Sequence, residues 1–221
     1  MKSISQIFLF LLTVFLTVSS PFFKRLTEEV IFSGIIIILS LGVALGLTFN
    51  FKKILFLSSF LLVLFSLWFG VNHFDKKLVT VSPLERLALK ERQNYFYPKA
   101  AKILFSESTL TLYKYNRNLF TNLDFNQFFF AGRPRYRDFA LDFPKFQPYL
   151  LPFLIIGLIL IIKRGLKLFL LTSVLVLLLV AVSDPSFTLG PLPIYPLITG
   201  VISLGVFKSI VYFILLARKI C

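Results

Sequence analysis

The chain has 221 residues, of which 57% are hydrophobic and only 15% are charged, and its mean hydropathy is +0.85. Soluble domains have an apolar share of roughly 45–50%, so this composition excludes an ordinary soluble globule and indicates a membrane protein. The formal net charge of +14 does not indicate nucleic-acid binding, because the basic residues lie between the hydrophobic segments and do not form one basic face.

The first third of the chain contains three hydrophobic segments, residues 3–20, 30–49 and 53–72, and none has a charge within its apolar body. A membrane-spanning helix needs about 20 mainly apolar residues, so each segment is a predicted span. The first could instead be a signal peptide, with Lys2 as its basic start and small residues at 17–20. It lacks an A-x-A cleavage site and a partner span follows closely, so we favour an uncleaved anchor.

A long polar insertion follows at residues 73–148, with thirteen basic and seven acidic residues and many aromatic ones. This aromatic content predicts a folded segment and not a disordered tail. The run Ser82–Glu85 is typical of a helix start with a capping box. It predicts an amphipathic helix that rests on the membrane face or on the outer ends of the spans. A second helix is predicted at residues 110–123, and Phe128–Phe130 is predicted to form an interfacial wedge.

Three further hydrophobic segments end the chain, residues 149–162, 168–183 and 197–217, and a tight basic turn joins the first two. The four prolines and one glycine of residues 184–196 exclude a regular helix there. Lys208 interrupts the last segment, and a lysine inside a membrane indicates a functional site. The alternative is a boundary lysine that snorkels to the surface.

The sequence therefore predicts an all-α integral membrane protein with about six transmembrane helices. It predicts three units: a membrane segment at residues 1–72, a helical extracytoplasmic insertion at 73–148 between helices 3 and 4, and a membrane segment at 149–221. With the N-terminus inside, the short inner segments hold eight basic residues and the short outer ones hold two. The positive-inside rule then predicts a protein of the cytoplasmic (inner) membrane with both termini cytoplasmic and residues 73–148 outside.

Motifs that carry chemistry are few. The chain has no Gly-rich phosphate loop, H-E-x-x-H or G-x-S-x-G, and His73 and Cys221 are its only histidine and cysteine. We therefore expect no metal and no cofactor. Four carboxylates are weak candidates for a catalytic base: Glu28, Glu29, Asp124 and Asp184. For the adjacent pair at 28 and 29, the simpler interpretation is that they complement the dipole of the second span.

An arginine cluster near the end of the insertion predicts an anion site. Pro134 favours an extended backbone, which would place Arg133, Arg135 and Arg137 on one face. Guanidinium groups suit phosphate oxygens, so the cluster is a candidate site for an anion or a lipid phosphate. The alternative is internal pairing with nearby acids, which would contribute little.

One stretch resembles a known family. The passage Asn118–Phe125, then Phe128–Gly132, then an apolar segment opened by Pro148 and Pro152, resembles bacterial GT-C-type membrane glycosyltransferases. The likeness covers about residues 95–205. It implies a lipid-linked sugar or polyprenyl phosphate as substrate. The family places its catalytic acid in a large first outer loop, which here is only residues 21–29, and it has more spans, so the resemblance implies a truncated or accessory relative.

Two classes of function follow. In the first, the protein handles a lipid-linked or anionic substrate of the cell envelope together with membrane lipids, and whether it is itself an enzyme is left open. In the second, it is a non-catalytic scaffold or interaction subunit that recruits partner membrane proteins. A transporter is less favoured, because the spans have almost no charged lining.

Overall fold

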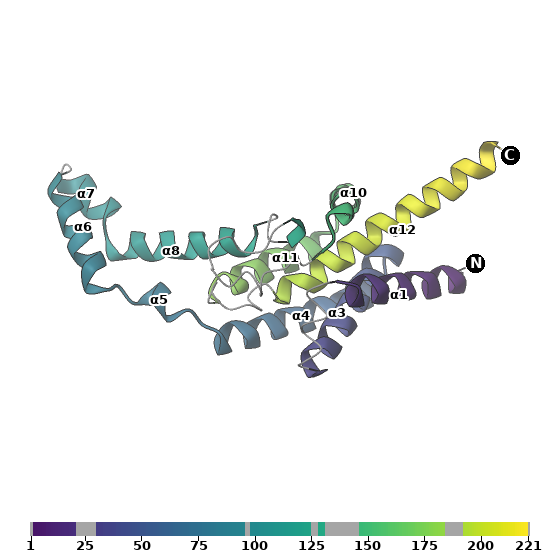
Figure 1. Cartoon of the computed structure of the whole chain (residues 1–221), viewed down its shortest axis with the longest axis horizontal. Helices are drawn as coiled ribbons and strands as arrows, with labels where there is room; N and C mark the ends of the chain where they lie inside the picture. Colours follow the sequence, from purple (N-terminus) through teal and green to yellow (C-terminus); the bar gives the residue numbers. More distant parts are fainter. Residues whose placement is uncertain are drawn as a thin grey trace.

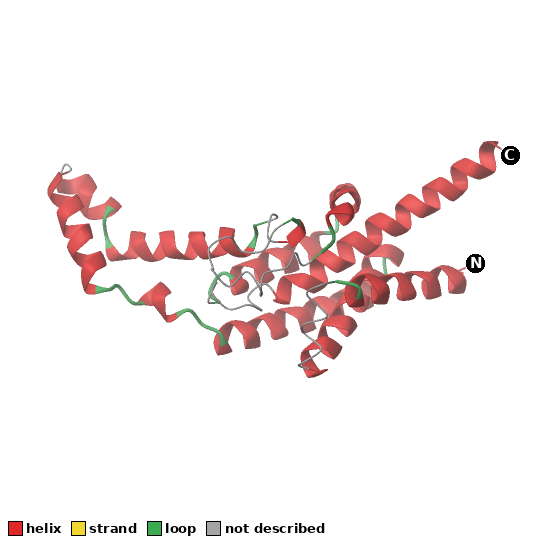
Figure 2. Ribbon diagram, viewed as in Figure 1, coloured by secondary structure: helices red, strands yellow, loops and turns green. Residues whose placement is uncertain are grey.

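The computed structural model describes residues 2–20, 30–95, 98–124, 128–130, 146–183 and 192–220, and the regular elements of these residues are helices (Figure 2). Six of the helices are apolar: α1 (Lys2–Val18), α3 (Val30–Phe49), α4 (Lys52–Asn72), α10 (Leu151–Arg164), α11 (Lys167–Val180) and α12 (Tyr195–Ile220). All six lie on segments that the sequence predicts as spans.

Three of the apolar helices are long and apolar enough to cross a membrane, at Phe32–Phe49, Lys52–Asn72 and Leu192–Ala217. The helices α1 and α11 are apolar but shorter. The helix α10 has 14 residues, which rise about 21 Å against a hydrocarbon core of about 30 Å. The structure thus confirms an all-helical chain suited to a membrane, while six spans stay a prediction.

The helix α12 is the centre of the bundle and packs against α1, α3 and α10. Where α12 meets α10, a Cβ atom added to Gly157 would lie 2.2 Å from the main-chain oxygen of Val201, and one added to Gly205 would lie 2.0 Å from that of Phe153. Figure 1 shows α10 nearly along its axis while α12 runs across the view, so the two helices cross. Small residues at this crossing let the two backbones touch.

Polar contacts join the first and last apolar helices in antiparallel order. The hydroxyl of Thr13 in α1 donates to that of Ser203 in α12 over 3.2 Å, and the Tyr195 hydroxyl donates to the main-chain oxygen of Thr17 over 3.1 Å. These contacts join the two ends of the sequence within one bundle.

Buried aromatic rings fix the chain just before α10. The ring of Phe146 stacks on Tyr195 at 4.7 Å and on Phe129 at 5.8 Å, and the Phe146 amide donates to the Phe128 carbonyl over 2.7 Å. The predicted interfacial wedge is therefore wrong for two of its three rings. Phe128 and Phe129 are buried, and only Phe130 is exposed, because the bundle takes the first two rings into its core.

Beyond the bundle extends a helical arm, which we define as residues 74–123. It contains α5 (Lys76–Val79), α6 (Pro83–Tyr95), α7 (Pro98–Leu104) and α8 (Glu107–Asn122). The arm and the two ends of the chain lie at opposite ends of the molecule (Figure 1). This arrangement agrees with an insertion on the side opposite both termini, while the side that faces the cytoplasm stays a prediction.

The predicted capping box at the start of α6 is confirmed. The Glu85 amide donates to the Ser82 hydroxyl over 3.2 Å, and the Ser82 amide donates to the Glu85 carboxylate over 2.9 Å. The predicted contact of this helix with the outer ends of the spans is wrong, because α6 has no buried residue and lies at the far tip of the arm, away from the apolar helices (Figure 1). The helix α8, with 16 residues, runs between the bundle and the tip of the arm and so keeps α6 away from the apolar helices. A position on the membrane face stays a prediction.

Candidate functional site

Polar side chains on α8 attach the arm to the end of α11. The Tyr115 hydroxyl donates to the Leu178 carbonyl over 2.9 Å, and the Asn122 amide donates to the Val180 carbonyl over 3.2 Å. Both acceptors belong to the last turn of α11, where carbonyl groups lack helical partners. Partial burial raises the pKa of Tyr115 above its ordinary value of 10.0, so its hydroxyl stays protonated, and able to donate, to a higher pH than an exposed tyrosine.

Asp75 ties the first turn of the arm to α8. Its carboxylate accepts from the Lys77 amide over 2.9 Å and so caps α5, and it also accepts from the Asn118 side chain at 3.3 Å. The Asp75 amide donates to the Val182 carbonyl over 3.0 Å. Asp75 and Asn118 are both buried. The Asp75 carboxylate therefore joins α5 to α8, and its main-chain amide joins them to the end of α11.

A single lysine organises the connection between α5 and α6. The ammonium group of Lys114 donates to the carbonyls of Lys77 and Thr80 and to the Glu85 carboxylate, each at 3.0 Å. The Ser82 amide, and after it Lys114, holds the pKa of Glu85 below its ordinary value. Glu85 is therefore ionised at neutral pH and committed to these contacts.

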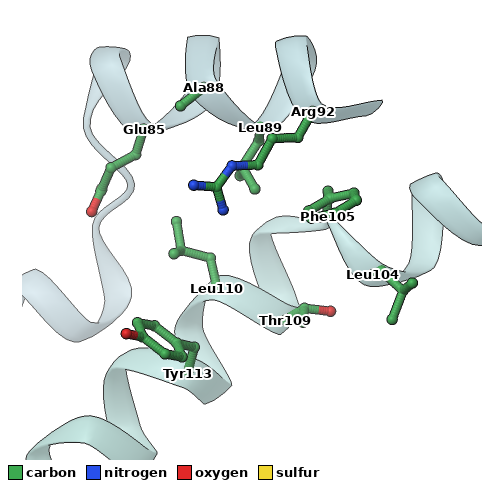
Figure 3. A pocket seen from close by; sticks show the side chains of 9 residues that line it. All are labelled: Glu85, Ala88, Leu89, Arg92, Leu104, Phe105, Thr109, Leu110 and Tyr113. Carbon is green, nitrogen blue, oxygen red and sulfur yellow. The ribbon is translucent and has the colours of Figure 1, made fainter. Parts of the chain in front are cut away.

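Between α6, α7 and α8 lies an open cavity of about 510 Å³, the arm cleft. Its walls are mainly apolar (Figure 3). The residues that line it are Glu85, Ala88, Leu89, Arg92, Leu104, Phe105, Thr109, Leu110 and Tyr113. Hydrogen bonds from the Gln93 side chain to the Phe105 carbonyl at 2.9 Å and from the Thr109 hydroxyl to the Ile103 carbonyl at 2.8 Å hold the helices around it.

Two charged side chains line the arm cleft, Glu85, which pairs with Lys114, and Arg92. The guanidinium group of Arg92 extends from α6 over the space between α6 and α8 (Figure 3). Two ion pairs occur among the described residues, Arg86 with Glu107 and Lys114 with Glu85, and Arg92 belongs to neither. The arm cleft thus offers apolar walls and a cationic group whose charge no described side chain neutralises.

Of the predicted site residues, the structure describes Asp124 and Lys208. Asp124 follows α8 and is partly buried. The other predicted residues of the outer side lie outside the described residues: Glu28, Glu29, Asp184, Arg133, Arg135 and Arg137. Among the described residues no group of three histidine, cysteine or acidic side chains could hold a metal.

Lys208 lies half-buried in α12, with its ammonium group 5.9 Å from the centre of the Phe207 ring. That ring packs edge-on against Phe49, the last residue of α3, at 5.8 Å. Lys208 is therefore level with the end of α3, which favours the interpretation as a boundary lysine.

The sequence analysis missed the arm cleft and the role of Asp75. A signal for both was present. Glu85, Leu89 and Arg92 share one helix face by their spacing, and an aspartate placed before two lysines is a typical helix cap. The pairing of that face with the α7–α8 segment depends on the fold of the arm, which spacing alone does not give.

Comparisons with models of protein families, with curated proteins and with solved structures found no match.

Proposed function

We propose that this chain is a multi-pass protein of the cytoplasmic membrane that acts as an interaction subunit, with its arm outside the membrane and a segment of a partner membrane protein held in the arm cleft. The arm cleft is the observation that carries this proposal, because it joins apolar walls to the cationic Arg92. Such a surface suits an amphipathic helix whose apolar face carries an acidic residue.

The exposed surface of the arm supports a protein partner. Apolar side chains that line the arm cleft are open to solvent, including Leu104 at 58% and Tyr113 at 61% exposure. Groups of exposed apolar side chains of this kind are typical of interaction sites.

The position of the arm cleft favours a protein over a lipid-linked substrate. The wall of the cleft that α6 forms lies at the tip of the arm, away from the apolar helices (Figure 1). A lipid-linked sugar keeps its lipid in the membrane, so its head group would have to reach the tip of the arm to fill the cleft, whereas a protein segment can extend so far.

The contacts of the outer carboxylates support a non-catalytic role. Asp75 caps a helix, Glu85 pairs with Lys114, and Glu107 pairs with Arg86 at 3.1 Å. A general base must be within reach of a substrate proton, and these three are committed to other groups. A transferase would therefore depend on carboxylates such as Glu28, Glu29, Asp124 or Asp184.

Photocrosslinking in intact membranes tests the proposal. A photoreactive amino acid would replace Leu104 or Tyr113, which line the arm cleft, and the adduct mass would be measured. We expect a protein adduct of one defined mass. The charge reversal Arg92→Glu should abolish it, because the proposed acidic group would then be repelled.

The matched control places the same photoreactive group at Leu87, which is 58% exposed on α6 and does not line the arm cleft. It should not give that adduct. Adducts with lipid alone, or equal protein adducts from Leu87 and Tyr113, would contradict the proposal.

A further inference from the structure

We propose that the end of the bundle opposite the arm carries a binding site for an anionic phospholipid, between the α3–α4 turn and the α10–α11 turn. The site is a cavity of about 490 Å³, the turn pocket. It is separate from the arm cleft, and the inference does not depend on the function proposed for the arm.

Two left-handed residues form the two turns. Asn50 ends α3 with φ of 55°, and Gly165 ends α10 with φ of 60°, the conformation that commonly ends a helix before a sharp turn. A guanidinium nitrogen of Arg164 donates to the Leu47 carbonyl over 2.8 Å and so holds the two turns side by side. The starts of α4 and α11 therefore meet at the turn pocket.

Three lysines surround the turn pocket: Lys52 and Lys53 from α4 and Lys167 from α11. All three are exposed. Neither Phe51 nor Leu166, the residues before these two helices, makes a side-chain cap hydrogen bond, so the amide groups of both helix starts add to the positive potential.

The described bundle contains no group that could neutralise these lysines. Residues 30–72, 146–183 and 192–220 include eight lysines and arginines and no aspartate or glutamate. None of the three lysines forms an ion pair with a described residue. An anionic ligand would therefore meet no competing acidic side chain among the described residues of the bundle.

Along the turn pocket, charged side chains are followed by apolar ones, as the head group of a phospholipid is followed by its acyl chains. The lysines begin α4 and α11, and the apolar side chains of Phe56 and Leu168 follow them along the same helices. Phe56 is 61% exposed and Leu168 is 36% exposed. Because α3 and α4 are both long and apolar enough to span, their turn lies at a membrane surface. A phosphate would then meet the lysines and an acyl chain would meet the apolar side chains.

Native mass spectrometry of the purified protein in detergent tests the site, with phosphatidylglycerol and phosphatidylcholine as probes. We expect the anionic lipid to bind more tightly than the zwitterionic one. The combined change Lys52→Gln, Lys53→Gln and Lys167→Gln should weaken phosphatidylglycerol binding by on the order of a hundredfold, since about 1 kcal/mol with anionic lipid is lost for each of the three lysines and about 1.4 kcal/mol is tenfold.

The matched control is the combined change Lys76→Gln, Lys90→Gln and Lys102→Gln, which removes the same charge from the arm and should leave binding unchanged. The three turn-pocket lysines replaced by arginine should retain binding, which separates loss of charge from loss of fold. Equal weakening by the control triple, equal binding of both lipids, or displacement of phosphatidylglycerol by millimolar inorganic phosphate would overturn the proposal.

Discussion

Arg164 at the end of α10 donates a hydrogen bond to the main-chain oxygen of Leu47 near the end of α3, over 2.8 Å. This bond crosses from one half of the sequence to the other and satisfies a carbonyl in the last turn of a helix, where no helical partner exists. It is also a charge-assisted bond, which is stronger than a neutral one. The two halves of the bundle are therefore joined at the end opposite the arm.

Replacing Arg164 with leucine should destabilise the bundle. We expect a loss of about 1–2 kcal/mol, because the Leu47 carbonyl would lose a charge-assisted donor in a partly buried place. Thermal unfolding of the purified protein in detergent measures this. The neighbouring change Lys163→Leu removes the same charge from an exposed side chain and should have a clearly smaller effect. Equal losses for both variants would show that the hydrogen bond does not matter.

The crossing of α10 and α12 should not tolerate a methyl group. Gly157→Ala and Gly205→Ala would each place a Cβ atom against a main-chain oxygen of the other helix, so the helices must separate. Overpacking of this kind costs about 1–3 kcal/mol, which a lower unfolding temperature in detergent would report. Gly34→Ala is the matched control, because nothing lies within 4 Å of the added atom. A similar loss for Gly34→Ala would mean that the effect is not one of packing.

Lys114→Met should loosen the start of α6. The change removes three hydrogen bonds from a side chain that is 11% exposed. We expect the amides of residues 76–86 to exchange with deuterium roughly tenfold faster, since such bonds contribute about 1–2 kcal/mol. Lys102→Met, at an exposed position of α7, should change nothing. Unchanged exchange in the Lys114 variant would contradict this role.

The stability of the start of α6 should fall at acid pH. The pKa of Glu85 is lowered from an ordinary value of 4.5, so its contribution is fully present above that value and is lost as the pH falls through the lowered pKa. Deuterium exchange of residues 82–86, corrected for its intrinsic pH dependence, should therefore rise only as the pH falls below the ordinary value of 4.5. The variant Glu85→Gln should lack this acid step, and its persistence there would assign it to another group.

Cysteine labelling on intact cells tests the predicted topology. Ser108→Cys lies at an exposed position of α8 and should react with an impermeant maleimide, whereas Cys221 should react only after the membrane is opened. This prediction rests on the positive-inside rule, because the short inner segments hold eight basic residues and the short outer ones hold two. The reverse labelling pattern would invert the topology.

Local signals predicted the local features of the structure. Hydrophobic length predicted the positions of α3 and α4, and the capping box at Ser82 and Glu85 formed as its spacing indicates. The prediction of where α8 starts was less accurate. It begins at Glu107, after Ser106 accepts from the Thr109 amide over 3.2 Å, and not at residue 110.

The features that the sequence did not predict depend on contacts between distant segments. Adjacent phenylalanines such as Phe128 and Phe129 are typical of a membrane interface. Only their contact with Phe146 and the bundle makes them core residues. The arm cleft is likewise formed by three helices, α6, α7 and α8, whose separate faces resemble ordinary packing stripes. In the sequence, the lysines of the turn pocket indicated only the orientation of the chain in the membrane. In the structure, the two adjacent turns bring these lysines together.

The contact between Thr13 and Ser203 has a consequence for biosynthesis. These residues are separated by 190 positions, and a ribosome adds about 5–20 residues per second, so roughly 10–40 s pass between their syntheses. During that interval α1 can pack against α3, but its Thr13 hydroxyl has only the Leu9 carbonyl of its own helix as acceptor. The bundle can close only when the last helix arrives, so a truncation that removes α12 should leave α1 and α3 without that partner and expose the chain to membrane quality control.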